Sequence, residues 1–176
     1  MNVRDSRPIA LIGLMGAGKT AVARCLGERL GVSVADLDSL LEAETGRTIA
    51  ELFEREGEAV FRQREGQLLE RVLADGVKVI ACGGGIVVDP RHRELLRGRC
   101  DVIWLGVSPG RAAQRLAGET AARPLLQGDA PVRRLERLLG ERESFYRETA
   151  HHLVDTEGLD PDAVAKQVLA VVGAAR

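Results

Sequence analysis

The chain has 176 residues, of which 45% are hydrophobic and 29% charged, and this composition fits one globular domain. Because 25 Lys and Arg residues nearly balance 26 Asp and Glu residues, the chain lacks the basic excess of a nucleic-acid-binding protein. It has no apolar run long enough to span a membrane and no apolar signal segment near residue 1. Three widely spaced cysteines indicate neither a disulfide framework nor a zinc site. We therefore expect a cytoplasmic, single-domain protein that binds neither nucleic acid nor membranes. A monomer is a separate expectation, which the composition does not supply.

Short apolar runs alternate with helical periodicity along the chain. Strands are predicted at residues 8–12, 32–35, 77–82, 102–107 and 152–155. Helices are predicted at residues 20–30, 39–45, 49–56, 58–74, 91–96, 109–118 (with Ser108 as its cap), 131–149 and 160–172. Because the strands are separated by helices, right-handed crossovers give a parallel sheet with helices on both faces. The predicted fold class is α/β, with a mobile loop at residues 118–124.

The segment from Gly13 to Thr20 matches G-x-x-x-x-G-K-[ST] in full and lies between a predicted strand and a predicted helix. Its glycines let successive backbone N–H groups turn toward a phosphate, and the helix N-terminus adds positive potential. Lys19 supplies a cation for the outer phosphates, and the Thr20 hydroxyl can bind Mg²⁺. The alternative is a glycine turn that fits the pattern by chance.

Two aspartates, Asp36 and Asp38, follow the second predicted strand, at the sheet edge where ligands of such folds bind. One carboxylate can hold the water shell of a metal, and the other can accept the proton of an attacking hydroxyl. The alternative is that Asp38 or Ser39 only caps the next helix.

Arg62 has Glu58 four residues before it and Glu65 three residues after it, so both carboxylates can reach its guanidinium on one helix face. A guanidinium held in this way suits bidentate binding of a small carboxylate. The alternative is an ordinary ion-pair ladder on a solvated surface.

The glycine triplet Gly83-Gly84-Gly85 follows the third predicted strand. Three consecutive glycines cost backbone entropy, so we interpret them as a place where a ligand approaches bare backbone, with a permissive turn as the alternative. Arg123, in the predicted loop, either neutralises a triphosphate or is a solvated loop arginine.

Other polar residues are interpreted as structural or solvated. This group comprises His92, His151, His152 and the arginine-rich helix face at residues 133–142, which glutamates interrupt.

Taken together, these segments resemble those of the shikimate kinase family over nearly the whole chain. The matching segments are Gly13 to Thr20, Asp36-Leu37-Asp38, Gly57 to Arg62, Gly83-Gly84-Gly85, Arg123-Pro124-Leu125-Leu126, Tyr146-Arg147 and Val154-Asp155-Thr156. The resemblance implies a nucleoside-monophosphate-kinase fold with strand order 2-3-1-4-5. It also implies a lid at about residues 118–130 and acceptor-binding helices at about 37–74, all within one domain. The implied reaction is ATP-dependent phosphorylation of the 3-hydroxyl of shikimate, with Mg²⁺ as cofactor, in aromatic amino acid biosynthesis.

On the nucleotide side, the resemblance implies that Arg123 is a catalytic lid arginine over the β- and γ-phosphates. Thr20 would bind Mg²⁺ directly, with Asp36 reaching it through water, and Arg115 would stack on adenine. The remaining contacts to ATP would come from the phosphate loop, namely Gly16, Ala17, Gly18, Lys19, Thr20 and Ala21. Ala21 departs from the family pattern, which commonly has a hydroxyl residue there, so only its backbone N–H is expected to contribute.

On the acceptor side, the resemblance implies that Asp38 binds the hydroxyls of shikimate and orients or deprotonates the nucleophile. Arg62 and Arg147 would bind the substrate carboxylate, and Gly84 would donate its backbone N–H within the triplet of Gly83, Gly84 and Gly85. The rival hypotheses are a kinase of the same fold for another hydroxy acid such as gluconate, a P-loop GTPase, and a catalytically silent binding module.

Overall fold

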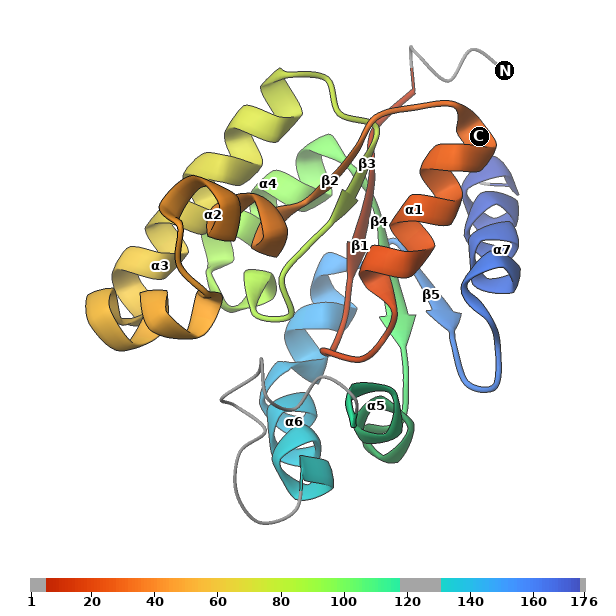
Figure 1. Cartoon of the computed structure of the whole chain (residues 1–176). Helices are drawn as coiled ribbons and strands as arrows, with labels where there is room; N and C mark the ends of the chain where they lie inside the picture. The colour runs from red at the N-terminus through yellow and green to blue at the C-terminus, as the bar shows by residue number, and fades with distance from the viewer. Residues whose placement is uncertain (1–5, 118–130, 175–176) are drawn as a thin grey trace.

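Five short strands form one parallel sheet in the order β2-β3-β1-β4-β5 (Figure 1), so the predicted fold class and strand order are confirmed. The computed structural model describes residues 6–117 and 131–174. The predicted lid at 118–130, with Arg123, lies outside the described residues. The strands are β1 Ile9–Ile12, β2 Val34–Asp36, β3 Val79–Ala81, β4 Asp101–Gly106 and β5 His152–Asp155.

Alternating side chains of the central strands supply two separate cores. On β1, Ile9 and Leu11 face one side of the sheet, whereas Ala10 and Ile12 face the other. All four side chains are buried, as expected for a parallel sheet covered on both faces.

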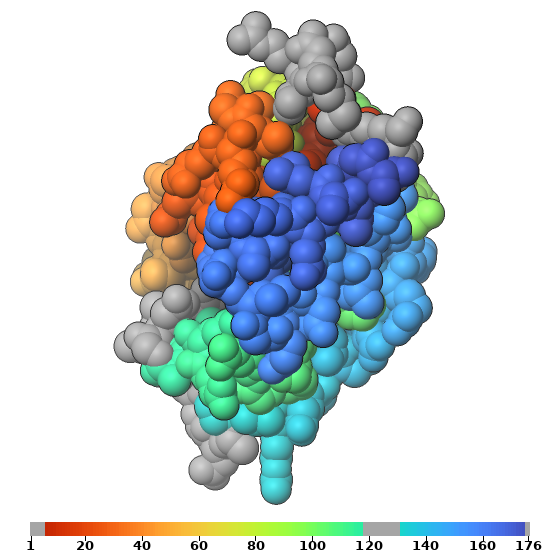
Figure 2. Space-filling model, turned by 90° about the vertical axis from the view of Figure 1, so that its right-hand side faces the viewer, coloured from red at the N-terminus to blue at the C-terminus, as the bar shows by residue number. Residues whose placement is uncertain are grey.

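Helices cover both faces of the sheet. The first face is covered by α1 (Lys19–Leu30) and α7 (Pro161–Ala174), which lie side by side (Figure 2) and are joined by the Arg29–Asp162 ion pair. The second face is covered by α3 (Ile49–Ala74), α4 (Pro90–Arg99) and α6 (Pro131–Thr149). Three shorter helices, α2 (Leu37–Thr45), the 3₁₀ helix η2 (Ile86–Val88) and α5 (Pro109–Leu116), follow β2, β3 and β4. Within the described residues, none of these helices is long and apolar enough to cross a membrane.

The helices differ from the prediction most at three places, and there are smaller shifts such as the earlier start of α2 and the earlier end of α5. First, α3 contains both predicted helices, 49–56 and 58–74, and Gly57 interrupts them with a non-helical φ of 77°. Second, α4 begins one residue earlier than predicted, because Asp89 caps its first turn and Pro90 begins it, and it continues past the predicted end to Arg99. Third, the helix η2, directly after the glycine triplet, is not predicted from the sequence, since three residues show no periodicity.

The carboxyl ends of β1, β2 and β3 lie at one edge of the sheet, because these neighbouring strands are parallel. The phosphate loop follows β1, the two aspartates follow β2, and the glycine triplet follows β3. The topology therefore gathers three of the predicted functional segments at one edge, as in other open α/β sheets.

Substituting Gly27 by Ala is expected to destabilise the fold, because α1 crosses the start of β2 closely at this residue. A Cβ on Gly27 would lie 2.2 Å from Val34 Cγ2 and 3.3 Å from the Val32 carbonyl oxygen. Overpacking of this kind costs about 1–3 kcal/mol. Chemical denaturation measures the change in the free energy of unfolding.

Gly140 provides the matched control, because it lies in the exposed part of α6 with open space around its Cβ position. Gly140→Ala is expected to stabilise the protein by about 0.5–1 kcal/mol through the higher helix propensity of alanine. Equal stabilities for the two variants would contradict the close crossing at Gly27.

Candidate active site

The phosphate loop joins β1 to α1 and is held by its own lysine. The ammonium group of Lys19 donates hydrogen bonds to the carbonyl oxygens of Gly13 (2.9 Å) and Leu14 (3.0 Å). Gly16 and Gly18 have positive φ angles of 79° and 91°, which side-chain-bearing residues rarely adopt. At Gly16 a Cβ would also lie 2.8 Å from the Ala112 carbonyl oxygen of α5. Gly16 is thus required for both conformational and packing reasons.

The N-terminus of α1 is left open to an anion. Its capping residue, Gly18, offers no side-chain hydrogen bond, and no acidic residue lies in the first turn. The backbone N–H groups of the first turn therefore keep their hydrogen-bonding capacity, and the helix dipole adds positive potential. This is the arrangement that binds phosphate in P-loop proteins.

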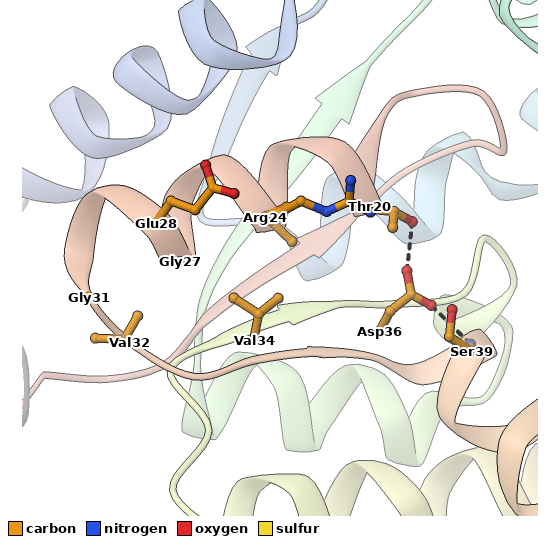
Figure 3. Close-up of a pocket in the computed structure, with 10 residues that line it drawn as sticks. Thr20, Arg24, Gly27, Glu28, Gly31, Val32, Val34, Asp36 and Ser39 are labelled. Carbon is orange, nitrogen blue, oxygen red and sulfur yellow. Dashed lines mark hydrogen bonds between the residues drawn. The ribbon is translucent and has the colours of Figure 1, made fainter.

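Thr20 and Asp36 bring two oxygen ligands together beside this helix N-terminus (Figure 3). The Thr20 hydroxyl donates a 2.6 Å hydrogen bond to Asp36 Oδ2. The other carboxylate oxygen of Asp36 accepts the Ser39 backbone N–H at 3.0 Å and thereby caps α2. The helix cap is thus Asp36, and the capping alternative considered for Asp38 and Ser39 is wrong. Because α2 begins one residue before Asp38, that carboxylate lies in the first helical turn.

Arg115 of α5 links the phosphate loop to the segment after β5. Its Nη1 donates to the carbonyl oxygens of Gly16 (3.2 Å) and Ala17 (3.4 Å) and to Thr156 Oγ1 (3.0 Å). Its Nη2 donates to the Thr156 carbonyl oxygen at 2.6 Å. The predicted nucleotide-binding arginine therefore lies directly against the phosphate loop.

The glycine triplet lies between the phosphate loop and the charged side chains of Asp38, Glu65 and Arg62. A Cβ on Gly83 would lie 2.7 Å from Asp38 Oδ1 and 2.8 Å from Glu65 Oε1, and one on Gly85 would lie 2.2 Å from Arg62 Nη2. A Cβ on Gly84 would meet backbone atoms of the phosphate loop at 3.5 Å. None of the three glycines has a positive φ. The triplet is therefore needed for close approach, and the groups that approach it here are side chains and backbone of the protein itself.

Arg62 and Glu65 are buried, so the interpretation of this pair as part of a solvated ion-pair ladder is wrong, whereas Glu58 is exposed. Only 8% of Arg62 and none of Glu65 is exposed. Arg62 Nη1 donates to Glu65 Oε2 at 2.7 Å, and Nη2 lies 3.4 Å from Glu58 Oε1. The guanidinium also lies 5.4 Å from the ring centroid of Phe53. Its buried Nε has no hydrogen-bond partner among the described residues.

A second arginine near the glycine triplet is Arg142. The charge pattern of α6 predicts that Arg142 belongs to a solvated helix face, and this prediction is wrong. Arg142 Nη1 donates to the Gly84 carbonyl oxygen at 3.2 Å, and the Tyr146 hydroxyl donates to the same oxygen. The signal in the sequence is helical phase, because Arg142 lies in register with the buried Leu135, Leu138 and Tyr146 of α6.

Arg147, the arginine predicted to bind the substrate carboxylate, lies on another face of α6. It is five residues after Arg142, which turns its side chain by about 140° around the helix. Its side chain is 69% exposed and forms an ion pair with Glu143 at 2.9 Å. Its guanidinium is 5.7 Å from the ring centroid of Trp104. The structure therefore brings Asp38, Arg62 and Arg142 together, but not Arg147.

The cluster holds a buried carboxyl group with an unusual proton affinity. Burial raises the pKa of Glu65 to about 7, and the nearby negative charge of Asp38 contributes to this increase. The positive charges of Arg62 and Arg142 and the hydrogen bond from Arg62 oppose the increase. Glu65 therefore changes its charge near neutral pH.

Among the described residues, no group of three or more His, Cys, Asp or Glu side chains could hold a metal ion. The donor set of Thr20 and Asp36 is different, because it offers two hard oxygens next to a phosphate site. Mg²⁺ is commonly bound by one or two protein oxygens, waters and substrate phosphates. These two residues therefore fit a magnesium ion carried by a nucleotide.

The comparisons with known proteins agree with this geometry. The shikimate kinase family model matches residues 15–173. The shikimate kinase of Symbiobacterium thermophilum is 43% identical over 162 residues, which cover 92% of this chain and 93% of the relative. The chain belongs to the shikimate kinase family. It therefore has shikimate kinase activity and acts in the shikimate pathway.

Solved structures of shikimate kinases show the same fold. The enzyme from Acinetobacter baumannii, solved in complex with shikimate, has a TM-score of 0.93 at 36% identity, covering 98% of this chain and 96% of that one. The enzyme from Bacteroides thetaiotaomicron has a TM-score of 0.87 at 28% identity, with 95% and 98% covered. A gluconokinase from Sinorhizobium meliloti shares the fold alone, with a TM-score of 0.58 at 17% identity.

Glu65→Gln is expected to flatten the pH dependence of stability. The pKa of Glu65 is about 7 in the folded protein, against an ordinary value of 4.5. The folded state therefore binds more protons between these values, and the stabilisation present below pH 4.5 is lost as the pH rises through 7. The full difference corresponds to about 3 kcal/mol. The glutamine side chain stays neutral at every pH, so the variant does not lose this stabilisation.

The measurement is chemical denaturation of both proteins between about pH 5 and pH 8, which spans most of this shift. We expect similar stabilities at the acidic end and a more stable variant at the basic end. Parallel stability profiles for the two proteins would show that Glu65 does not titrate in this range.

Proposed function

We propose that the described site transfers the γ-phosphoryl group of ATP to the 3-hydroxyl of shikimate. The observation that carries this proposal is the position of the glycine triplet. Gly84 packs against the phosphate loop, while Gly83 and Gly85 pack against Asp38, Glu65 and Arg62. A phosphate site and a carboxylate-binding cluster thus share one wall, as in-line transfer between two bound substrates requires.

The nucleotide side is built from the phosphate loop and α5. We propose that the backbone N–H groups of Gly16, Ala17, Gly18, Lys19, Thr20 and Ala21 surround the phosphates. The Lys19 ammonium, now bonded to the Gly13 and Leu14 carbonyls, is placed to neutralise outer phosphate oxygens. Arg115 contributes from α5 on the adenine side. Ala21 needs only its backbone for this role.

Thr20 and Asp36 are the residues that would hold Mg²⁺, Thr20 through its hydroxyl and Asp36 through water. Held by these residues, the ion would supply positive charge beside the phosphates of the nucleotide. The 2.6 Å hydrogen bond between Thr20 and Asp36 keeps the hydroxyl oriented beside the helix N-terminus. Arg123 remains a prediction as a further neutralising charge, as do the cytoplasmic location and the monomeric state.

The acceptor side is built from α2, α3 and α6. Arg62 Nη2 has a long 3.4 Å contact to the exposed Glu58, so this end of the guanidinium can bind a carboxylate while Glu65 holds the Nη1 side. Arg142, through its contact with the Gly84 carbonyl, supplies the second cation that we propose in place of Arg147. The backbone N–H of Gly84 is proposed to donate to the same substrate.

Asp38 is proposed to orient the attacking hydroxyl. Its Oδ1 lies against Gly83, next to Gly84 and the phosphate loop. A carboxylate at this position accepts a hydrogen bond from the hydroxyl and directs its oxygen toward the phosphate. Because phosphoryl transfer is largely dissociative in most analyses, orientation contributes more than early proton removal.

Asp38, Arg62, Glu65 and Arg142 form what we call the acceptor cluster. Removing either of its arginines is expected to weaken the binding of shikimate selectively. Arg62→Ala and Arg142→Ala should each raise the KM for shikimate about 10-fold to 100-fold, as expected for loss of a charge-assisted hydrogen bond. The KM for ATP should change less than about twofold, because neither arginine belongs to the phosphate loop. A coupled ADP-release assay with each substrate varied in turn gives both constants.

Arg147→Ala is the matched control on the same helix, since its exposed side chain contacts Glu143 and the ring of Trp104 rather than the cluster. Its KM for shikimate should remain close to that of the wild type. A large increase in the KM for shikimate in Arg147→Ala, with none in Arg142→Ala, would favour Arg147 as the arginine that binds the substrate carboxylate. The same assay with gluconate or a nucleoside monophosphate as acceptor tests the substrate class.

Lys19→Met is expected to abolish turnover while leaving the fold intact. Methionine keeps much of the length of the side chain but removes both the charge and the hydrogen bonds to the loop carbonyls. We expect kcat to fall at least about 1000-fold, as for removal of a group that stabilises transition-state charge. Circular dichroism checks the fold, and substantial retained kcat would argue against the proposed phosphate site.

A further inference from the structure

His92 is a buried histidine directly behind the acceptor cluster. It lies on α4 with only 4% of its surface exposed. The ring lies against Gly66 of α3, where a Cβ would come within 2.4 Å of His92 Nε2. The absence of a side chain at Gly66 therefore creates the space that the imidazole occupies.

The imidazole presents an unsatisfied nitrogen toward Glu65. His92 Nδ1 is buried, has no hydrogen-bond partner among the described residues, and lies 3.9 Å from Glu65 Oε2. That same oxygen accepts the 2.7 Å hydrogen bond from Arg62 Nη1. Glu65 Oε1 also lacks a partner in the described part of the chain. A shift of about 1 Å would bring the histidine and the carboxyl group within hydrogen-bond distance.

Charged groups face this pair from several elements. On the histidine side, Asp89 Oδ2 lies 4.0 Å from Nε2, Arg91 and Arg62 act electrostatically on the ring, and the ring bonds to the Ile86 backbone. On the carboxyl side the charges are those of Arg62, Asp38 on α2 and Arg142 on α6. Burial lowers the pKa of His92, so the ring is mainly neutral at neutral pH.

We propose that His92 is a positioning residue of the acceptor site, which acts through Glu65 to hold the Arg62 guanidinium in its carboxylate-binding orientation. This inference rests on the proposed role of Arg62 in binding the carboxylate of shikimate. His92 itself does not touch the substrate. Arg62 bonds to only one oxygen of the Glu65 carboxyl group. In the proposal, His92 restricts the rotation of that carboxyl group.

The polar character of residue 92 is what distinguishes this role from packing. An apolar side chain would fill the space over Gly66 without burying an unsatisfied nitrogen, which costs about 1–3 kcal/mol. Placing an imidazole there is therefore unfavourable for stability alone. In the proposal, the compensating benefit is a polar neighbour 3.9 Å from Glu65, whose carboxyl group is completely buried.

The test compares three substitutions at two positions. His92→Leu fills the space but removes the nitrogen, whereas His92→Asn keeps a polar group near the position of Nδ1. Gly66→Ala displaces the ring without removing any polar group. We expect His92→Leu and Gly66→Ala to raise the KM for shikimate about fivefold, because the hydrogen bond from Arg62 to the substrate is kept but its orientation is lost. The kcat and the KM for ATP should stay within about twofold of the wild type. His92→Asn should match the wild type in all three constants.

His152→Leu is the matched control, because His152 is a partly buried histidine on β5, away from α3 and α4. It should leave the KM for shikimate unchanged. Unchanged KM values for His92→Leu, or equal increases for His92→Leu and His92→Asn, would overturn the proposal in favour of simple packing. If His92→Leu does not fold, Gly66→Ala and His92→Asn decide the question.

Combining His92→Leu with Arg62→Ala separates this inference from the proposed function. If His92 acts through Arg62, its effect on the KM for shikimate disappears in the Arg62→Ala background. If Arg62→Ala alone leaves that KM unchanged, the carboxylate-binding role of Arg62 fails. If Arg62→Ala raises the KM but His92→Leu does not, only the role of His92 fails.

Discussion

The close approach of bare backbone at residues 83–85 is the contact on which the site depends. Each glycine of the triplet faces a different group: the carboxylates of Asp38 and Glu65, the backbone of the phosphate loop, and the guanidinium of Arg62. Side chains on these residues would push the loop and the acceptor cluster apart. Because catalysis of phosphoryl transfer consists mainly of positioning and charge stabilisation, this spacing sets what the site can do.

Burial gives the charges of the acceptor cluster their effect. Arg62 and Glu65 are almost completely removed from solvent, whereas ion pairs elsewhere on the helices, such as Arg147 with Glu143, are exposed. Exposed pairs contribute little to stability because water and salt screen them. A buried guanidinium is less screened and has fewer alternative partners, so a carboxylate that reaches it is bound in a defined orientation.

Much of this structure follows from local sequence patterns. The phosphate loop, the α/β class and most helices are predictable, because glycine spacing and apolar periodicity are local signals. The interruption at Gly57 is also predictable, since glycine separates two periodic segments. The position of Asp36 and Asp38 at the carboxyl edge of the sheet is predictable, because the ends of parallel strands meet there. The parts that could not be predicted depend on contacts between distant residues. The burial of Arg62 depends on how α3 packs against the sheet. For Arg142 and Arg147 the helical phase of α6 is a local signal, but only the packed structure shows which arginine reaches the glycine triplet.

The bridge made by Arg115 has a consequence for how the chain is organised. One guanidinium bonds to carbonyls at residues 16 and 17 and to Thr156, whose hydroxyl donates in turn to the Gly106 carbonyl. The first and last βα units of the chain are therefore fastened to each other at the nucleotide end of the molecule. Loss of Thr156 would therefore free one side of the Arg115 guanidinium and weaken its hold on the phosphate loop, which lies far away in the sequence.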